Sequence, residues 1–422
     1  MTPAARIQAA IEIVGGLENT AQPADRFLSD WFAARRYAGS KDRAAIAARV
    51  YDVLRHRASY SWRMGSGEAR ALAIASLQAE KKSPDEIEAL FAAGAYGPPP
   101  LTDAERATMG SPTHDAPPNH IEGEYPVWLE PELIRAFGEN LLPEMQAMQA
   151  RAPVDLRVNT LRAERNGILV GLASLGLKAR PTPYSPDGVR LDSAEGLGAL
   201  HHTSFFQTGA FEFQDESSQI VSLLCGAEPG MSVLDLAAGA GGKSLALAAT
   251  MQNRGEILAF DDYPERLKAL NPRARRAGAS IIKVAKSRGG PFWGDGKFDI
   301  VLVDAPCSGS GTWRRSPELK WRLTAERLAT LTAAQASLID DGARHTVSGG
   351  RLVYATCSIL PAENGDQIDN FLARNSEFRV LDAQSIWRAR GLVEPPGLGR
   401  YFVASPLTTG TDGFFACVMT RN

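Results

Sequence analysis

The first 95 residues carry apolar side chains at the three- and four-residue spacing of amphipathic helices. In AAIAARVYDVLRHR, for example, Ile46, Val50, Val53 and Leu54 share one helical face. We therefore expect a small helical domain at residues 1–122. It ends in the proline-dense run GPPP, PTHDAPPNH and EYP, which favours a linker because proline breaks helices and central strands.

The pattern changes again after this run. Residues 127–205 mix the helical patterns PVWLEPELIRAFG and GILVGLASLGL with the strand patterns DLRVN and GVRL. From residue 206 onward, apolar strands alternate with helices, as in an open, mostly parallel sheet. The expected fold class is α/β, with a small α+β domain at 123–205 and a Rossmann-like catalytic domain at 206–422.

Composition excludes several classes of protein. The chain has 422 residues, of which 44% are apolar and 22% charged, so it is neither disordered, collagenous nor a coiled coil. Its net charge is −2, and any nucleic-acid binding must therefore use local basic patches. No stretch resembles a membrane helix, and Glu12 interrupts the N-terminal apolar run. We expect a cytoplasmic protein.

Basic residues concentrate in two regions. Residues 1–70 contain eleven Lys or Arg against seven Asp or Glu, and residues 266–288 contain eight Lys or Arg with no acidic residue. Each region is compatible with a solvated helix face or with an RNA-contacting surface. The sequence leaves both interpretations open.

A glycine-rich turn joins the first strand of the catalytic domain to a helix. The strand MSVLDL, which ends near Asp235, runs into AAGAGGKS and then LALAATM. Gly239, Gly241 and Gly242 allow close approach of a ligand to the backbone. Asp261 follows Gly241 by 20 residues, the spacing of an acidic residue that binds ribose. This combination predicts a nucleoside cofactor.

Two of the four cysteines directly follow buried strands. Cys307 comes after FDIVLVD and Cys357 after RLVYA, and open α/β sheets bind ligands at that edge. If the two strands are neighbours, both thiols face one pocket. Cys225 and Cys417 are typical of packing residues. The spacing of the four indicates no disulfide framework and no metal site, so we expect free thiols.

The segments around these cysteines suit a nucleophile and a polynucleotide. Pro361 and Glu363 predict a helix whose positive N-terminus would favour a thiolate at Cys357. The loop GSGTWRRSPELKW places basic residues between Trp313 and Trp321, which suits phosphates and stacked bases, although a plain surface loop is the alternative.

At this point the motifs resemble those of one family. VLDLAAGAGGKS, VLVDAPCSGSGTWRR and YATCSILPAEN are similar to successive motifs of the Nop/Sun family of S-adenosylmethionine-dependent RNA cytosine-C5 methyltransferases, and GTDGFFAC resembles its closing strands. RAPVDLRVNTLR and FQDESSQ extend the resemblance over about residues 125–422. DRAAIAARVYDVLRHR resembles the NusB-like domain of the bacterial Sun or Fmu type, whose members act on 16S ribosomal RNA.

The resemblance implies a mechanism and a set of site residues. Cytosine C5 needs covalent addition at C6 to become nucleophilic, and the resemblance assigns this attack to Cys357 and product release to Cys307. Asp304 matches the position that hydrogen-bonds the target cytosine, and Lys243 matches a lysine near the methyl donor and the base. The implied S-adenosylmethionine contacts are Ala238, Gly239, Gly241, Gly242, Lys243, Asp261 and Asp304.

The substrate implied by the resemblance is RNA, first of all 16S ribosomal RNA, bound by a monomer without a metal. Residues 123–205 would form an RNA-binding domain, and the target would be a flipped or single-stranded cytosine. The residues expected to bind neighbouring phosphates are Arg157, Arg314, Arg315 and Lys320.

The chain departs from the family pattern at two points. Ala237-Ala238-Gly239-Ala240 replaces the proline-containing CAAPGGK turn, and VAKSRGG carries Lys286 where an acidic residue commonly lies near the adenine. Two alternatives stay open: the same chemistry on transfer RNA, and a ribosome-assembly RNA-binding factor with little turnover. A DNA methyltransferase is disfavoured, because it would use the PC cysteine and need no second one.

Overall fold

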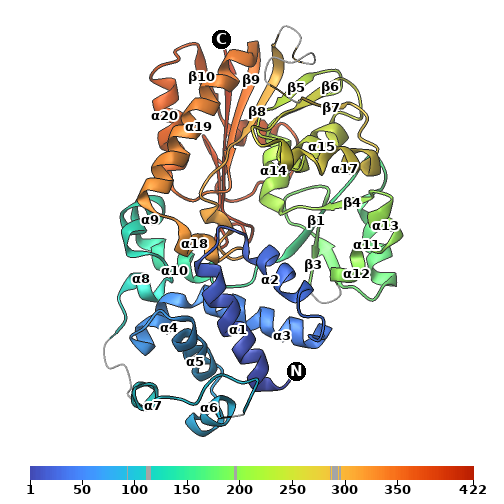
Figure 1. Ribbon diagram of the computed structural model, residues 1–422. Coiled ribbons are helices and arrows are strands. Elements are labelled where there is room, and N and C mark those ends of the chain that lie inside the picture. Colours follow the sequence, from blue (N-terminus) through green and yellow to red (C-terminus); the bar gives the residue numbers. More distant parts are fainter. Residues whose placement is uncertain (93, 111–115, 194–196, 286, 288–292, 294–295) are drawn as a thin grey trace. The chain divides into compact units, whose positions relative to one another are not determined.

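The N-terminal region is helical, as the spacing of its apolar residues predicted (Figure 1). The chain forms two units: unit 1 is Met1–Arg151 with Trp313–Leu323, and unit 2 is Ala152–Thr312 with Thr324–Asn422. The division after Arg151 differs from the boundaries at 122 and 205 that the sequence predicted. The computed structural model describes residues 1–92, 94–110, 116–193, 197–285, 287, 293 and 296–422.

Unit 1 has a helical core, and its described residues contain no strand. Ile13, Ile46, Leu72, Ile74 and Phe91 are fully buried in this core. Two short helices, α7 and α8, lie within the proline-dense run, which otherwise forms no regular structure in its described part. The helices are α1 (Pro3–Glu18), α2 (Ala24–Ala33), α3 (Ser40–Arg55), α4 (Arg57–Met64), α5 (Ala69–Ala79), α6 (Pro84–Phe91), α7 (Asp103–Gly110), α8 (Asn119–Glu122), α9 (Glu130–Phe137), α10 (Leu141–Ala147), and the 3-10 turns η1 (Val127–Leu129) and η2 (Gly138–Asn140).

A segment from the second half of the chain completes unit 1. It contains helix α18 (Glu318–Arg322). Trp313 is 1% exposed and Lys320 is 4% exposed, and the indole N–H of Trp321 donates to the carbonyl oxygen of Leu54 at 2.7 Å. Trp313 and Lys320 are therefore buried and do not form the plain surface loop that was the alternative interpretation of this segment.

Unit 2 begins with a small antiparallel sheet in the order β2-β3-β1-β4. The predicted strands DLRVN and GVRL are β1 and β3. Leu156, Val158, Val189 and Phe211 are buried together with residues of helix α11. The elements are β1 (Val154–Val158), α11 (Arg165–Ser174), β2 (Ala179–Pro181), β3 (Gly188–Leu191), α12 (Leu197–Leu200), α13 (Ser204–Gln207) and β4 (Phe211–Phe213).

The larger sheet of unit 2 has the order β10-β12-β9-β8-β5-β6-β7, and β11 pairs with β12. Strands β5 to β9 pair in parallel, whereas β12 is antiparallel to β9, β10 and β11. This confirms the expected Rossmann-like, mostly parallel sheet. The strands are β5 (Ser232–Asp235), β6 (Glu256–Ala259), β7 (Ile282–Val284), β8 (Phe298–Asp304), β9 (Thr346–Thr356), β10 (Phe378–Leu381), β11 (Phe402–Ala404) and β12 (Phe414–Arg421).

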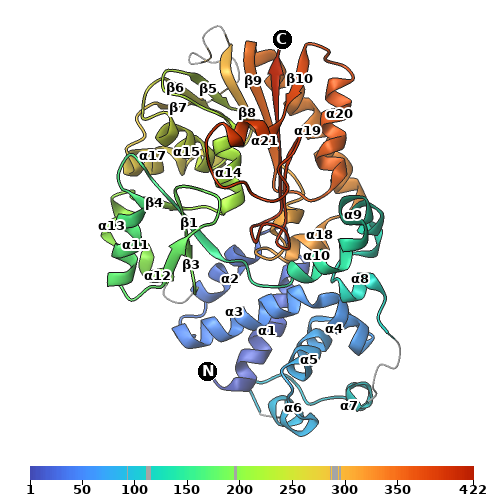
Figure 2. The same cartoon turned by 180° about the vertical axis from the view of Figure 1, so that it is seen from behind.

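Helices cover both faces of this sheet (Figures 1 and 2). Alternate strand residues divide between the faces: Val233 packs with α14, α15 and α17, and Leu234 packs with α19 and α20. The strand order reverses between β5 and β8, where sheets of this type bind ligands at the carboxyl ends. The helices and turns are α14 (Glu216–Leu224), α15 (Gly242–Thr250), α16 (Pro264–Leu267), α17 (Leu270–Ala277), η3 (Ser310–Thr312), α19 (Ala325–His345), η4 (Pro361–Glu363), α20 (Gly365–Leu372) and α21 (Ala383–Arg388). Among the described helices, none is both long and apolar enough to span a membrane.

Candidate active site

The glycine turn lies between β5 and α15, as predicted. Gly239 and Gly241 have φ angles of 54° and 81°, a left-handed region that favours glycine. A Cβ atom on Gly241 would lie 2.0 Å from a methyl carbon of Leu270, whereas one on Gly239 would meet no atom within 4 Å. The open side of Gly239 leaves room for a ligand against the backbone. The turn therefore fits the nucleoside part of S-adenosylmethionine.

Asp261 binds this turn directly. Its Oδ2 accepts a hydrogen bond from the backbone N–H of Gly239 at 3.0 Å, and its Oδ1 accepts one from Tyr263 at 2.8 Å. The lone pairs that these bonds leave can accept hydrogen bonds from ribose hydroxyls. The structure thus brings Asp261 to the glycine turn, where the 20-residue spacing placed it.

Asp235 lies beneath the turn at the end of β5 and is 1% exposed. Its Oδ2 accepts a hydrogen bond from the Ser244 hydroxyl at 2.6 Å, and its Oδ1 is buried without a hydrogen-bond partner. Burial raises the pKa of Asp235 from its ordinary value of 3.8 to about 7. Below that pKa, the carboxyl keeps its hydrogen bond with Ser244 without adding a buried charge.

The Asp235→Asn variant is expected to be more stable than the wild type at pH 7, by about 1–3 kcal/mol. Between the ordinary pKa of 3.8 and the folded value of about 7, the folded protein holds more protons than the unfolded chain. Wild-type stability therefore falls as the pH rises through this window, and the amide removes that loss. Urea unfolding at pH 5 and pH 7 measures the effect. Asp369→Asn, which alters an exposed carboxylate, should leave the difference between the two pH values as in the wild type.

Lys243 and Asp304 form an ion pair across the switch point of the sheet. The Nζ of Lys243, in the first turn of α15, lies 2.6 Å from Oδ2 of Asp304 at the end of β8. Lys243 is 8% exposed, and its Nζ also lies 4.9 Å from the ring centroid of Phe414. The pair places one cation and one anion beside the glycine turn.

Cys307 and Cys357 face each other across neighbouring strands. Strands β8 and β9 are parallel partners, with Asp304 opposite Ala355, so the loops that follow them leave the sheet side by side. The two Sγ atoms are 3.4 Å apart, and both cysteines are free and partly exposed. The condition for a shared pocket, that the two strands are neighbours, is therefore met.

The environments of the cysteines differ. The hydrogen bond with Cys357, burial and the negative charge of Glu363 raise the pKa of the Cys307 thiol well above its usual value. Cys307 therefore holds its proton at neutral pH. Cys225 and Cys417 are 0% exposed, and burial raises the pKa of Cys225 to about 12. This confirms their assignment as packing residues.

The sequence missed a carboxylate that lies behind the cysteine loops. We expected Glu363 at the start of an α-helix, but it ends the 3-10 turn η4, and α20 begins at Gly365. Its carboxylate is fully buried and accepts hydrogen bonds from Ser308, Ser358 and Gln335. The sequence held one signal for such a shared partner: each of the two cysteines is directly followed by a serine, and both serine hydroxyls bind this carboxylate.

The four residues expected to bind phosphates occupy different environments. Arg157 is 6% exposed and donates to the carbonyl oxygen of Gly242 at 2.7 Å, and burial lowers its pKa to about 10. In unit 1, Arg314 is 5% exposed, and burial lowers the pKa of Lys320 to about 8. These three side chains are buried, whereas a phosphate contact favours an exposed position, and their RNA-binding role stays a prediction. Arg315 is partly exposed, and its role stays a prediction.

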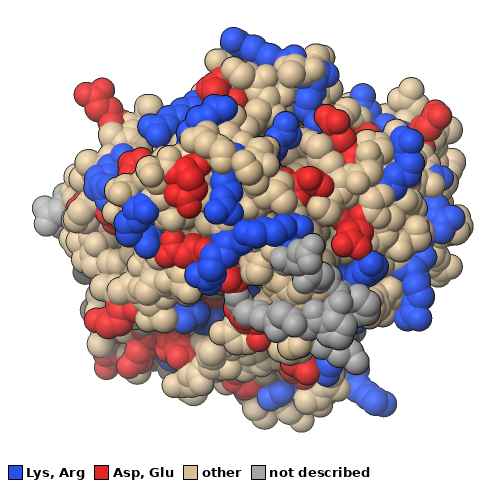
Figure 3. Space-filling model, turned by 90° about the horizontal axis from the view of Figure 1, so that it is seen from above, with Lys and Arg blue, Asp and Glu red and all other residues tan. Residues whose placement is uncertain are grey.

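The basic run at 266–288 is partly structural. Arg273 and Arg276 form ion pairs with the buried carboxylate of Glu212, and Arg273 also donates to the carbonyl oxygen of Ala240 in the glycine turn at 2.6 Å. Lys286 and Arg288 lie outside the described residues. On the face seen in Figure 3, Lys and Arg side chains alternate with Asp and Glu, and they form no continuous basic patch there.

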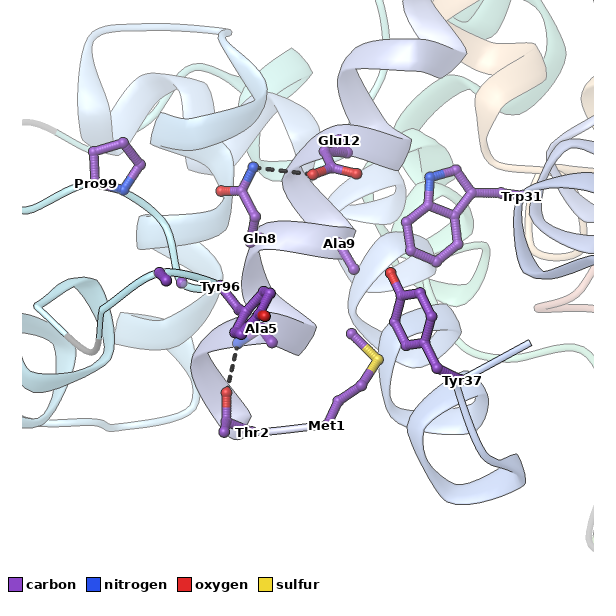
Figure 4. A pocket seen from close by; sticks show the side chains of 12 residues that line it. Met1, Thr2, Ala5, Gln8, Ala9, Glu12, Trp31, Tyr37, Tyr96 and Pro99 are labelled. Atoms are coloured by element: carbon purple, nitrogen blue, oxygen red, sulfur yellow. Dashed lines mark hydrogen bonds between the residues drawn. The ribbon is translucent and has the colours of Figure 1, made fainter. Parts of the chain in front are cut away.

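A cavity of about 840 Å³ lies elsewhere, within unit 1 (Figure 4). Its walls include Trp31, Tyr37 and Tyr96, and it contains none of the residues that the sequence singled out for catalysis. Among the described residues, no cluster of His, Cys, Asp or Glu could hold a metal ion. The functional assignment therefore rests on the cysteines, the ion pair and the glycine turn.

Comparisons with known proteins agree with this geometry. The family model for 16S rRNA methyltransferase RsmB/F matches residues 223–420, and the ferredoxin-like domain model of RsmF/B-like methyltransferases matches residues 125–196. The chain is 32% identical over 325 residues to the probable ribosomal RNA small subunit methyltransferase B of Bacillus subtilis, covering 74% of this chain and 71% of that protein. It is 35% identical over 255 residues to the corresponding methyltransferase of Salmonella paratyphi A, covering 60% of this chain and 58% of that protein.

Two solved structures share the fold. The crystal structure of PH0851 matches with a TM-score of 0.81 and 25% identity, covering 100% of this chain and 99% of the other. The structure of NSun6 from Pyrococcus horikoshii with SFG, an S-adenosylmethionine analogue, matches with a TM-score of 0.60 and 20% identity, covering 70% of this chain and 98% of the other. The methyltransferase model that matches residues 223–420 and this neighbour support S-adenosylmethionine as the cofactor.

Proposed function

Because the chain belongs to the family of 16S rRNA methyltransferases that the RsmB/F model describes, we propose that it methylates carbon 5 of a cytosine in 16S ribosomal RNA. The observation that carries this proposal is the pair of thiols 3.4 Å apart at the ends of β8 and β9. A cytosine can be activated at C5 by a covalent bond at C6, and it must afterwards be released. Two adjacent thiols at the ends of neighbouring strands suit these two tasks.

The proposed reaction begins at Cys357. Its thiolate forms a bond to C6, and the electron pair of the C5–C6 double bond becomes available at C5. S-Adenosylmethionine, when bound, would supply an electrophilic methyl group for this carbon; the bond between its sulfur and the methyl carbon breaks, and S-adenosylhomocysteine is the product that leaves. The C5 proton is then removed, the bond between sulfur and C6 breaks, and the double bond forms again. Cys307 lies 3.4 Å from the sulfur that departs, and we assign it to this release step.

Lys243 and Asp304 complete the proposed site. The Asp304 carboxylate is partly exposed, and the ammonium of Lys243 lies 2.6 Å from its Oδ2. The remaining lone pairs of the carboxylate can accept hydrogen bonds from the target base. Such a hydrogen bond stabilises the charge that develops on the ring during attack. The site accepts only a base that has left its stack, because the thiolate must approach C6 from the face of the ring that a neighbouring base would cover.

The Asp304→Asn variant is expected to lower kcat by about 10²–10³-fold, because it removes this preorganised acceptor and leaves the Lys243 charge without its partner. Single-turnover kinetics with saturating RNA measure the loss, and the thermal unfolding transition tests whether the fold survives. Asp369→Asn, on an exposed face of α20, provides the control and should retain wild-type kcat. An unchanged kcat for Asp304→Asn would remove Asp304 from the reaction.

Methyl transfer from labelled S-adenosylmethionine to separate pools of unmethylated 16S ribosomal RNA and transfer RNA tests the proposed function. Nucleoside analysis of the product should show labelled 5-methylcytidine in the ribosomal pool alone. Label confined to transfer RNA would reject the proposed substrate and retain the chemistry. Cofactor binding without labelled cytidine in either pool would instead favour an RNA-binding assembly factor.

A further inference from the structure

We propose that Glu363 is a positioning residue that holds the loops of Cys307 and Cys357 together through one buried carboxylate. The inference rests on the proposed function and adds a residue to its site. Glu363 lies six residues after Cys357 and 56 residues after Cys307 in the chain. It touches neither sulfur by a hydrogen bond, so its effect on the reaction must act through the two loops.

The carboxylate is bonded to both loops at once. Its Oε1 accepts from the backbone N–H of Ser308 at 2.8 Å and from the side-chain amide of Gln335 at 3.0 Å. Its Oε2 accepts from the hydroxyls of Ser308 and Ser358, each at 2.5 Å. Ser308 and Ser358 directly follow the two cysteines, so a single side chain fixes both motifs at adjacent positions.

The segment that carries Glu363 is itself held in place. The Tyr354 hydroxyl donates to the carbonyl oxygen of Glu363 at 2.6 Å, and the side-chain amide of Asn364 donates to the carbonyl oxygen of Ser358 at 2.9 Å. The loops also meet directly, because the N–H of Gly311 donates to the carbonyl oxygen of Cys357 at 2.9 Å. A fixed carboxylate between fixed loops explains the close approach of the two sulfurs.

The carboxylate has four neutral donors, and no ion pair found among the described residues includes Glu363. A buried carboxylate without a cation is costly unless its lone pairs are filled by hydrogen bonds, as they are here. Its negative charge contributes to the raised pKa of Cys307. Glu363 therefore holds the two thiol loops together and raises the pKa of the Cys307 thiol.

The first test measures thiol geometry and needs no RNA. Phenylarsine oxide binds tightly only where two thiols can bond to one arsenic atom. The wild type should bind it with one equivalent per chain, and Cys307→Ala should define the affinity of a single thiol. Glu363→Gln should weaken binding at least tenfold, because the amide keeps one acceptor oxygen and loses the other. Glu377→Gln, a change of the same kind on an exposed residue, should bind as the wild type does.

The second test measures catalysis and acidity. Glu363→Gln should lower kcat at least tenfold while leaving the KM for S-adenosylmethionine and RNA within twofold. The pH profile of Cys307 alkylation should move to lower pH, because the nearby negative charge is lost. Ser358→Ala should also lower kcat, and the double variant should lose less than the product of the two single losses, because both act through the same carboxylate.

Unchanged arsenical affinity and kcat in Glu363→Gln would overturn the proposal. So would a variant that loses S-adenosylmethionine binding together with its thermal transition, since Glu363 would then support the fold in general. Glu363→Gln could bind the arsenical more weakly than the wild type while the wild type forms no 5-methylcytidine. In that case the proposed function fails and the positioning role stands.

Discussion

Cys357→Ala is expected to abolish methyl transfer and covalent complex formation, whereas Cys307→Ala is expected to accumulate a covalent RNA complex. The proposed nucleophile has no substitute in the site, so its loss should lower kcat by at least about 10⁴-fold. Cys307 is assigned to release, and without it the bond between Cys357 and C6 forms but breaks slowly. Denaturing gel electrophoresis of RNA and protein in the presence of S-adenosylmethionine measures both outcomes.

The four free cysteines provide a matched control for this experiment. Cys225 is fully buried in the core of unit 2, and burial raises the pKa of its thiol to about 12. Cys225→Ala should therefore keep both the rate and the transient adduct of the wild type. A stable adduct in Cys357→Ala would reverse the roles of the two site cysteines. Absence of an adduct in every variant would argue against covalent catalysis.

Arg190→Met is expected to lower the free energy of unfolding by about 3–5 kcal/mol. Arg190, on β3, donates two hydrogen bonds to the carboxylate of Asp155 on β1, at 2.7 and 2.8 Å, and lies 3.7 Å from a carboxylate oxygen of Glu216. All three are at most 9% exposed. Methionine fills similar volume but leaves two buried carboxylates without their cation. Urea unfolding at pH 7 measures the loss.

Arg180→Met is the control for this substitution. Arg180 lies on β2 directly opposite Arg190, and its side chain is 64% exposed in an ion pair with Asp192. Exposed pairs of this kind contribute about 0–1 kcal/mol, so this variant should differ little from the wild type. The deficit of Arg190→Met should also shrink toward pH 4, where the unpaired carboxyls take up protons. Equal losses in both variants would show that the buried cluster adds no stability.

The chemistry of the site could be predicted because it depends on residues close in sequence. The glycine turn and Asp261 follow neighbouring strands β5 and β6, and their spacing reflects the fixed length of a strand–helix–strand unit. Cys307 and Cys357 could likewise be placed at strand ends from the apolar runs before them. Parallel strands expose their carboxyl ends at one edge of the sheet. The sequence therefore left open only whether the strands before Cys307 and Cys357 are neighbours.

The basic residues could not be predicted in the same way. Lysine and arginine favour solvent on average, so a sequence read alone assigns them to a surface. Arg157 instead donates to the start of α15, and Arg273 and Arg276 pair with Glu212. Lys320 is buried in unit 1 because its segment, Trp313–Leu323, belongs to that unit although it lies in the second half of the chain. Partners distant in sequence decided each of these outcomes.

By itself the sequence determined the α/β class, the helical N-terminal region, the glycine turn and the two strand-end cysteines, because periodicity and local spacing encode them. Only the tertiary structure decided that β8 pairs with β9, that the sulfurs lie 3.4 Å apart, and that Glu363 binds both loops. These features depend on contacts between segments some 50 residues apart. No local pattern specifies such contacts; they arise when strand pairing and burial bring the segments together.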